Sequence, residues 1–183
     1  MSKPLGRVRV IGGSLRGTRI PVERAVGLRP TSDRVKETLF NWLSLDVKGA
    51  RCLDLFAGTG ALGIESLSRG ASTVTFVEKN PILGGAISAL LMSLGISKAE
   101  VCLQDSINYI ESCDTRFDII FLDPPFKSDL LLPSLELISE RNLQPNGVVY
   151  VEFMKNELEL PKEWRRLKAG STKSMEYSLL TKR

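Results

Sequence analysis

The sequence predicts an α/β fold built around a mostly parallel sheet. Stretches rich in Val, Ile, Leu and Phe alternate with longer stretches of helical apolar spacing, and one apolar stretch runs directly into a glycine-rich turn. An alternating basic and apolar segment precedes this repeat, and two short strand-like segments follow it. We therefore expect a parallel sheet with right-handed crossovers, a β-hairpin before it and an antiparallel edge after it.

Length and composition set the class of protein. The chain has 183 residues, which suits one domain with a small extension. It shows no apolar run of transmembrane length and no basic-then-apolar leader, so we expect a soluble, cytoplasmic protein that acts as a monomer and contacts no membrane. The absence of histidine excludes Ser-His-Asp and Cys-His catalysis and most zinc sites, and no metal is expected. Cys52, Cys102 and Cys113 lack C-x-x-C spacing and are interpreted as core thiols.

Positive charge is concentrated at the N-terminus. Residues 1–36 hold nine Lys or Arg and two acidic residues. Between residues 7 and 22, apolar and basic side chains alternate around a glycine-rich turn, which predicts a hairpin with Arg7 and Arg9 on one face and Val8 and Val10 on the other. We expect residues 1–30 to form an arm that contacts RNA phosphates, and residues 31–183 to form the main domain. A basic face that is merely solvated is the alternative. The RNA-binding candidates are Arg7, Arg9, Arg16, Arg19, Arg29 and Arg34.

The elements of the main domain follow in order. A helix that covers one edge of the sheet is predicted after residue 31. Residues that favour a helix start lie between Leu28 and Asp33, and an apolar stripe follows at Val35, Leu39 and Leu43. Strands are predicted at about 51–56, 73–78, 99–103, 117–122 and 147–153. Helices are predicted at about 60–69, 81–94, 106–112 and 128–140. The helix at 81–94 is the least secure, because Gly84 and Gly85 each cost roughly 1 kcal/mol relative to alanine. Short strands near 164–168 and 174–181 are expected to pair antiparallel at one edge.

The glycines at 58, 60 and 63 predict a tight turn that brings backbone amides close to a nucleotide-like cofactor. The same spacing occurs in turns that bind dinucleotides, and Glu78 stands where a ribose partner would be needed. Asp54 favours S-adenosylmethionine over a nicotinamide cofactor. A carboxylate just before the glycines would repel a pyrophosphate, whereas it would attract the ammonium and sulfonium cations of S-adenosylmethionine.

Further polar residues come directly after predicted strands, where open parallel sheets bind ligands. Glu78, followed by Lys79 and Asn80, is expected to accept hydrogen bonds from ribose hydroxyls. Asp105, followed by Ser106, is expected to lie by the adenine amino group. The alternative for Asp105 is that it caps the helix that begins at Ser106.

Asp123-Pro124-Pro125-Phe126 is the most specific signal in the chain. Two prolines stiffen the loop and remove two amide donors, so we expect its carbonyls to be free to face a substrate. The Asp123 carboxylate and the Pro124 carbonyl can accept the N–H bonds of a planar amine, so that its nitrogen becomes nucleophilic without a strong base. Phe126 offers a face on which an unstacked base can lie. An ordinary Pro-Pro turn with a core phenylalanine is the alternative.

Three segments together resemble a known family. D-L-F-A-G-T-G from Asp54, D-P-P-F from Asp123 and the N-terminal segments V-I-G-G-S-L-R-G and L-R-P-T-S-D-R-V-K-E-T-L-F-N-W-L are similar to those of the bacterial small-subunit ribosomal RNA guanine-N2 methyltransferases. The resemblance covers nearly the whole chain. It implies a Rossmann-like class I methyltransferase fold with a seven-stranded sheet, S-adenosylmethionine as methyl donor and a guanine amine of ribosomal RNA, free or in a small-subunit particle, as acceptor.

The resemblance also implies site residues. Arg29, Pro30 and Thr31 match a segment expected to close over the donor. The cofactor-binding candidates are Thr31, Asp54, Phe56, Gly58, Gly60, Glu78, Lys79, Asn80, Asp105 and Ser106, and the catalytic candidates are Asp123, Pro124, Pro125 and Phe126. Gly84, Gly85 and the tail from Ser171 depart from the family pattern. Two other functions remain open: a DNA adenine-N6 methyltransferase, which would share the D-P-P-F loop, and a nonenzymatic RNA-binding assembly factor.

Overall fold

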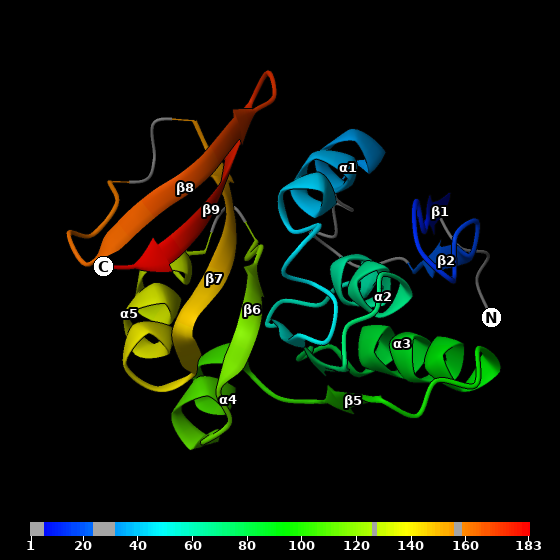
Figure 1. The fold of residues 1–183 in the computed structure, drawn as a ribbon. Coiled ribbons are helices and arrows are strands. Elements are labelled where there is room, and N and C mark those ends of the chain that lie inside the picture. Colours follow the sequence, from blue (N-terminus) through cyan, green and yellow to red (C-terminus); the bar gives the residue numbers. More distant parts are fainter. Residues whose placement is uncertain (1–5, 24–31, 126–127, 156–158) are drawn as a thin grey trace.

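A computed structural model describes residues 6–23, 32–125, 128–155 and 159–183 of the chain (Figure 1). The strands are β1 (Gly6–Arg9), β2 (Arg19–Val22), β3 (Arg51–Asp54), β4 (Thr73–Val77), β5 (Ala99–Cys102), β6 (Phe117–Leu122), β7 (Leu143–Met154), β8 (Trp164–Ser171) and β9 (Met175–Lys182). The helices are α1 (Asp33–Trp42), α2 (Ala61–Ser68), α3 (Pro81–Ser93), α4 (Ser106–Ser112) and α5 (Leu131–Arg141). None of the helices in these described segments is long and apolar enough to span a membrane.

The main sheet has seven strands in the order β5-β4-β3-β6-β7-β9-β8. The five strands from β5 to β7 run parallel, and β9 lies antiparallel between β7 and β8. This confirms the predicted parallel sheet with an antiparallel C-terminal edge. The order of strands along the sheet reverses between β3 and β6, and a doubly wound sheet binds its ligands at the carboxyl ends of such a pair.

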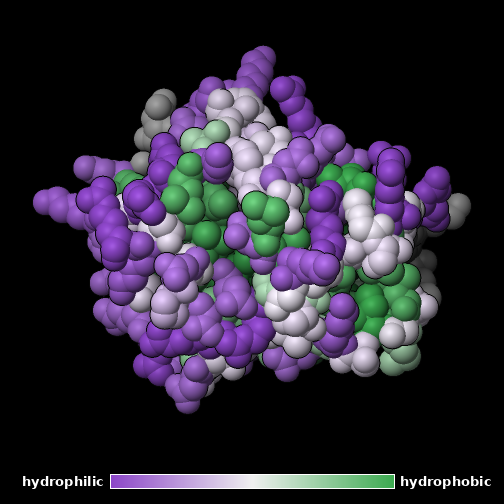
Figure 2. Space-filling view, viewed as in Figure 1, coloured by the Kyte–Doolittle hydropathy of each residue, from purple (hydrophilic) through white to green (hydrophobic). Residues whose placement is uncertain are grey.

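Helices cover both faces of this sheet (Figure 1). On one face, α1, α2, α3 and the N-terminal hairpin share a buried apolar cluster that includes Phe40, Ile64 and Ile87. On the other face, side chains of α4 and α5, among them Ile110 and Leu135, form a second cluster. Figure 2 shows that hydrophilic side chains cover most of the visible surface and that hydrophobic ones gather in separate patches. The sheet therefore lies between two layers, and its carboxyl edge is the place where loops from both layers meet.

The N-terminal hairpin has the predicted alternation, with the register Val8 opposite Ile20 and Arg9 opposite Arg19. The valines and isoleucine are buried and the arginines are exposed. Glu65 of α2, which has no exposed surface, accepts the amides of Ile11 and Gly12 at 2.8 and 2.9 Å. Because both hairpin amides bond to a buried carboxylate, the hairpin is held firmly against α2.

Helix α1 begins at the N-cap Ser32, whose hydroxyl accepts the Val35 amide, and its stripe of Val35, Leu39 and Leu43 is buried as predicted. The expected position at one edge of the sheet is wrong. Phe40 packs on Phe121 of β6 with ring centroids 6.1 Å apart, so the helix lies over the middle of the sheet. Trp42 of the same helix stacks on Tyr177 of β9 with ring centroids 5.5 Å apart, a contact that the stripe alone did not predict.

The boundaries of several elements differ from the prediction, those of α5 and β7 among them. Helix α5 begins at Leu131 rather than at 128, because the Ser128 amide donates to the Pro125 carbonyl and residues 128–130 form a bend and a turn instead. Strand β7 starts at Leu143, before the predicted 147. Helix α3 forms in full despite its two glycines. A Cβ on Gly84 would lie 2.2 Å from Leu103 Cδ2, so this glycine allows close packing against the segment that follows β5.

Candidate active site

The glycine-rich turn after β3 has the predicted strand-turn-helix form. Gly58 and Gly60 adopt φ values of 53° and 74°, which favour glycine. The Gly60 amide donates to the Ala57 carbonyl at 2.6 Å and closes the turn. A Cβ on Gly63 would lie 2.2 Å from Phe76 Cε1, so the third glycine lets α2 pack closely on β4. These roles explain the three glycines whatever ligand the turn binds.

Asp54 lies at the end of β3 and is 4% exposed. Its Oδ2 accepts the Gly63 amide at 3.0 Å and thereby fixes the start of α2. Burial raises the pKa of this carboxyl to about 7; the Gly63 amide lowers it, and the nearby Glu78 charge raises it. A bound cation beside Asp54 would favour the charged form of a group that is otherwise only part-ionised near neutral pH.

Asp54 should make the stability of the protein depend on pH. Its pKa in the folded chain is above the ordinary value of 3.8, so its contribution to stability is present below pH 4 and is lost as pH rises through about 7. Asp54→Asn keeps an acceptor for Gly63 but no charge. Relative to the unaltered protein, this variant should gain about 3 kcal/mol in unfolding free energy between pH 5 and pH 8. Urea unfolding at both pH values measures this, with Asp118→Asn as a control. A pH-independent difference would contradict the raised pKa.

Glu78, directly after β4, connects the two neighbouring loops. One oxygen accepts the Gly58 amide at 2.9 Å and the other accepts the Asn80 amide at 2.8 Å. The side chain is half-buried. Because each carboxylate oxygen has two acceptor positions, both can still accept a hydroxyl proton from a ligand. Glu78 therefore shapes the glycine turn and faces the same carboxyl edge.

Several other cofactor candidates have structural tasks at helix starts. The Asp105 carboxylate accepts the amides of Ile107 and Asn108 at 3.0 and 3.4 Å, which is the capping role named as its alternative. Asn80 likewise caps α3 by accepting the Ile82 amide at 2.9 Å. Ser106 is buried and Lys79 is exposed. Capping fixes where these side chains lie and is compatible with a ligand at their remaining positions.

Phe56 is half-buried and packs against the cluster on the α4 and α5 side of the sheet. Thr31, Arg29 and Phe126 lie outside the described residues.

Asp123, Pro124 and Pro125 follow β6, next to the glycine turn. The pairing of Asp54 with Phe121 makes β3 and β6 direct neighbours at their carboxyl ends. Asp123 is half-buried and Pro124 is buried. The expectation that all carbonyls of this loop are free is wrong for Pro125, whose oxygen accepts both the amide and the hydroxyl of Ser128, at 2.8 and 2.6 Å. Ser128 therefore bonds to the end of the described loop through both its amide and its hydroxyl.

A buried pair that the sequence reasoning missed lies beside this loop on β7. The Tyr150 hydroxyl donates to Glu152 Oε1 at 2.7 Å, and both residues are almost wholly buried. The β6–β7 register, with Phe121 opposite Tyr150, brings Glu152 to the level of Asp123. Burial and the negative charge of Glu152, followed by that of Asp123, raise the pKa of Tyr150 well above its usual value. The one signal in the sequence for this buried pair is the glutamate in the otherwise apolar run V-Y-V-E-F.

The basic candidates stand apart from these acidic groups. Arg7, Arg9, Arg16 and Arg19 are exposed on the hairpin, and Arg34 is exposed on α1. Arg9 lies 3.7 Å from Asp33, a pair in which both side chains are about half exposed or more, so it stays accessible to a phosphate.

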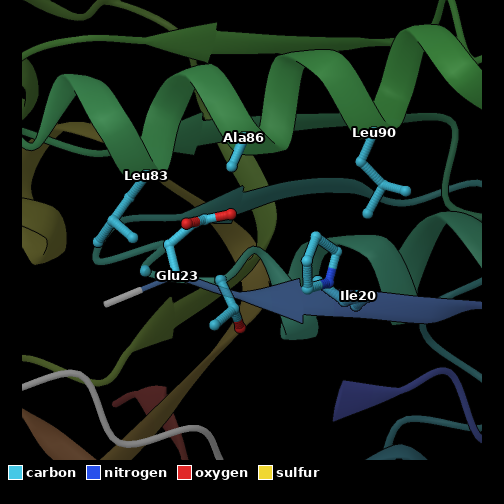
Figure 3. Close-up of a pocket in the computed structure, with 8 residues that line it drawn as sticks. Ile20, Glu23, Leu83, Ala86 and Leu90 are labelled. Carbon is cyan, nitrogen blue, oxygen red and sulfur yellow. The ribbon is translucent and has the colours of Figure 1, made fainter. Parts of the chain in front are cut away.

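A small pocket opens between the hairpin and the glycine turn (Figure 3). Ile20 and Glu23 from the hairpin side face Leu83, Ala86 and Leu90 of α3 across it, and the turn contributes Gly58 and Thr59. Its walls are mostly apolar. The pocket therefore joins the N-terminal hairpin to the loop that holds the cofactor candidates.

This fold and this arrangement of loops are those of a class I methyltransferase. The model of a family described as Conserved hypothetical protein 95 matches residues 8–181. A Haemophilus influenzae protein named Ribosomal RNA small subunit methyltransferase D is 43% identical, with 95% of this chain and 93% of the relative covered. Its Escherichia coli namesake is 40% identical over 80% of this chain and 75% of its own length. The chain belongs to this methyltransferase D family.

Solved structures agree with this assignment. The structure of an Escherichia coli protein named as a methyltransferase has a TM-score of 0.87 and 36% identity, and the alignment covers 97% of this chain and 98% of the other. A Haemophilus influenzae protein named as a methylase has a TM-score of 0.82 and 39% identity, with 96% and 98% covered. The expected methyltransferase fold with an N-terminal hairpin is therefore confirmed.

Proposed function

We propose that this protein transfers a methyl group from S-adenosylmethionine to the exocyclic N2 amine of a guanine in small-subunit ribosomal RNA. The observation that carries the proposal is the adjacency of β3 and β6, which brings the glycine turn beside Asp123 and Pro124. The names of the relatives support ribosomal RNA as the substrate. The exposed arginines of the hairpin suit an RNA backbone.

The residues at the carboxyl edge fit S-adenosylmethionine chemically. Glu78 offers acceptors to the ribose hydroxyls, and its two amide bonds hold the carboxylate in place. Asp54 supplies a buried carboxyl that a cation would keep ionised. When bound, S-adenosylmethionine supplies a methyl group on a positively charged sulfur.

The acceptor amine is oriented by the loop after β6. Asp123 and the Pro124 carbonyl accept N–H bonds from N2, which directs the nitrogen lone pair toward the methyl carbon. The nitrogen–carbon bond forms as the carbon–sulfur bond breaks and its electron pair stays on sulfur. One proton then leaves N2 for the Asp123 carboxylate or water. Phe126 is proposed to stack on the guanine.

Methyl transfer to small-subunit ribosomal RNA, free and in assembled particles, tests the function. With tritiated S-adenosylmethionine, label should appear in RNA, and nucleoside analysis should identify it as N2-methylguanosine. Label in N6-methyladenosine would contradict the guanine assignment. Binding of RNA without any transfer would favour a nonenzymatic assembly factor.

Glu78→Ala should weaken donor binding by about 1 to 3 kcal/mol, because the ribose hydroxyls lose their half-buried acceptor. Glu78→Gln keeps one acceptor oxygen and should lose less. Titration calorimetry with S-adenosylmethionine measures both variants, with Glu111→Ala, an exposed residue of α4, as the control. Unchanged affinity in Glu78→Ala, or tight binding of NAD by the unaltered protein, would overturn the donor assignment.

A further inference from the structure

The C-terminal strands carry a second concentration of positive charge. Residues 164–183 hold six Lys or Arg and one Glu, whereas residues 37–163 hold ten basic and 18 acidic residues. The acidic middle of the chain is thus flanked by a basic segment at each end. Figure 1 shows that β8 and β9 lie on the opposite side of α1 from the β1–β2 hairpin. Basic segments from the two ends of the chain therefore lie on two sides of α1.

Two lysines of this region lie at the carboxyl edge of the sheet. Lys173 is in the turn between β8 and β9, and Lys155 directly follows β7. The pairing of Met154 with Met175 places both beyond the last residue pair of the β7–β9 ladder, on the edge where Asp123 follows β6. Both lysines are exposed, and no ion pair involves either of them among the residues that the structure describes.

The turn that carries Lys173 is held in place by several hydrogen bonds. The Thr172 amide donates to the Met175 carbonyl at 2.8 Å, and the Met175 amide donates to the Thr172 hydroxyl at 3.1 Å. The Lys155 amide donates to the Ser174 carbonyl at 3.3 Å and so joins the two lysine-bearing segments. The atoms at the top of Figure 2, where the β8–β9 hairpin ends, are hydrophilic. The backbones that carry the two charges are thus fixed relative to each other.

Protection of an edge strand explains only part of this charge. β8 is an outer strand, and Arg165, Arg166 and Lys168, together with the irregular register between the last two, discourage pairing with another chain. Lys155 and Lys173 are not part of that strand, so edge protection gives no reason for them. Their common position on the edge that holds the catalytic loop would explain their charge by contact with the substrate.

We propose that Lys155 and Lys173 form a second RNA-binding surface, which contacts phosphates on the side of the target base opposite to the N-terminal hairpin. The inference rests on the proposed function and assigns RNA contact to residues outside the hairpin. RNA held from both sides across the carboxyl edge would leave one nucleotide facing Asp123, between two fixed backbone contacts.

The double variant Lys155→Gln with Lys173→Gln tests this surface. Each lost phosphate contact should reduce the slope of log affinity against log salt by about 0.7 to 0.9, so the double variant should lose up to about 1.6. At about 0.1 M salt its affinity for small-subunit ribosomal RNA should fall roughly tenfold to fortyfold. Filter binding over a series of salt concentrations measures both, and calorimetry should show unchanged S-adenosylmethionine affinity.

Lys48→Gln with Lys162→Gln is the matched control. Both lysines are exposed and precede strands, so they lie at the amino edge of the sheet, and the charge removed is the same. This variant should keep the RNA affinity and salt slope of the unaltered protein. If the two double variants behave alike, the second surface is overturned, while methyl transfer by the unaltered protein would leave the proposed function standing.

Discussion

Asp123→Ala is expected to slow methyl transfer to RNA by about a hundredfold to a thousandfold. This corresponds to roughly 2.7 to 4 kcal/mol of transition-state stabilisation, the usual loss when one oriented hydrogen-bonding group is removed from an active site. The carboxylate follows β6 beside the glycine turn, and its expected role is to hold an N–H bond rather than to act as a strong base. S-adenosylmethionine affinity should change little. Single-turnover rates with saturating RNA measure the effect on the reaction itself.

Asp123→Asn separates orientation from charge. The amide keeps a carbonyl oxygen that can accept one N–H bond, so this variant should retain more activity than alanine. Asp46→Ala removes an exposed carboxylate before β3, at the amino edge, and should react at the normal rate. If Asp123→Ala methylated guanine as fast as the unaltered protein, the acceptor site would have to lie elsewhere.

Removal of the charges of the N-terminal hairpin should have the other large effect, on RNA affinity. Replacing Arg7, Arg9, Arg16 and Arg19 by glutamine should reduce the salt slope by up to about three and the affinity near 0.1 M salt by as much as about a thousandfold. All four guanidiniums are exposed, and their removal leaves the buried valines in place. Filter binding at several salt concentrations gives both quantities.

The control for the hairpin variant uses arginines at the other edge. Arg51, Arg116 and Arg141 are exposed and lie at or before the starts of strands, so their replacement removes similar charge far from the proposed RNA path. S-adenosylmethionine affinity should be normal in both variants. An unchanged salt slope in the hairpin variant would mean that its arginines are only solvated.

Much of the fold could be predicted because its signals are local. Alternation between apolar strands and helical stretches predicted the parallel sheet, and period-two alternation placed Val8 and Arg9 on opposite faces of the hairpin, as observed. The glycines at 58 and 60, predicted to form a tight turn from their spacing, adopt positive φ values there. In each case the pattern depends on residues only a few positions apart.

The parts that were missed depend on contacts between distant residues. From the sequence, Glu65 is expected to be an ordinary polar residue on a helix. It becomes a buried acceptor only because the hairpin packs on α2, and its partners lie 53 and 54 residues away in the chain. Lys36 is fully buried because its ammonium reaches the Arg9 carbonyl and Asp33, at 2.5 and 3.1 Å. Glu152 lies beside Asp123 through the order of the strands. Periodicity along the chain contains none of this information.

The attachment of the hairpin to Glu65 has a consequence for how the protein unfolds. If the hairpin separated while the rest stayed folded, a buried carboxylate would lose two amide donors and the apolar face under Val8, Val10 and Ile20 would be opened to water. Both changes are unfavourable, so partial opening at this point is suppressed. The hairpin therefore belongs to the same cooperative unit as the sheet, and an RNA that bound its arginines would find them already ordered, without the entropic penalty that a disordered basic tail would carry.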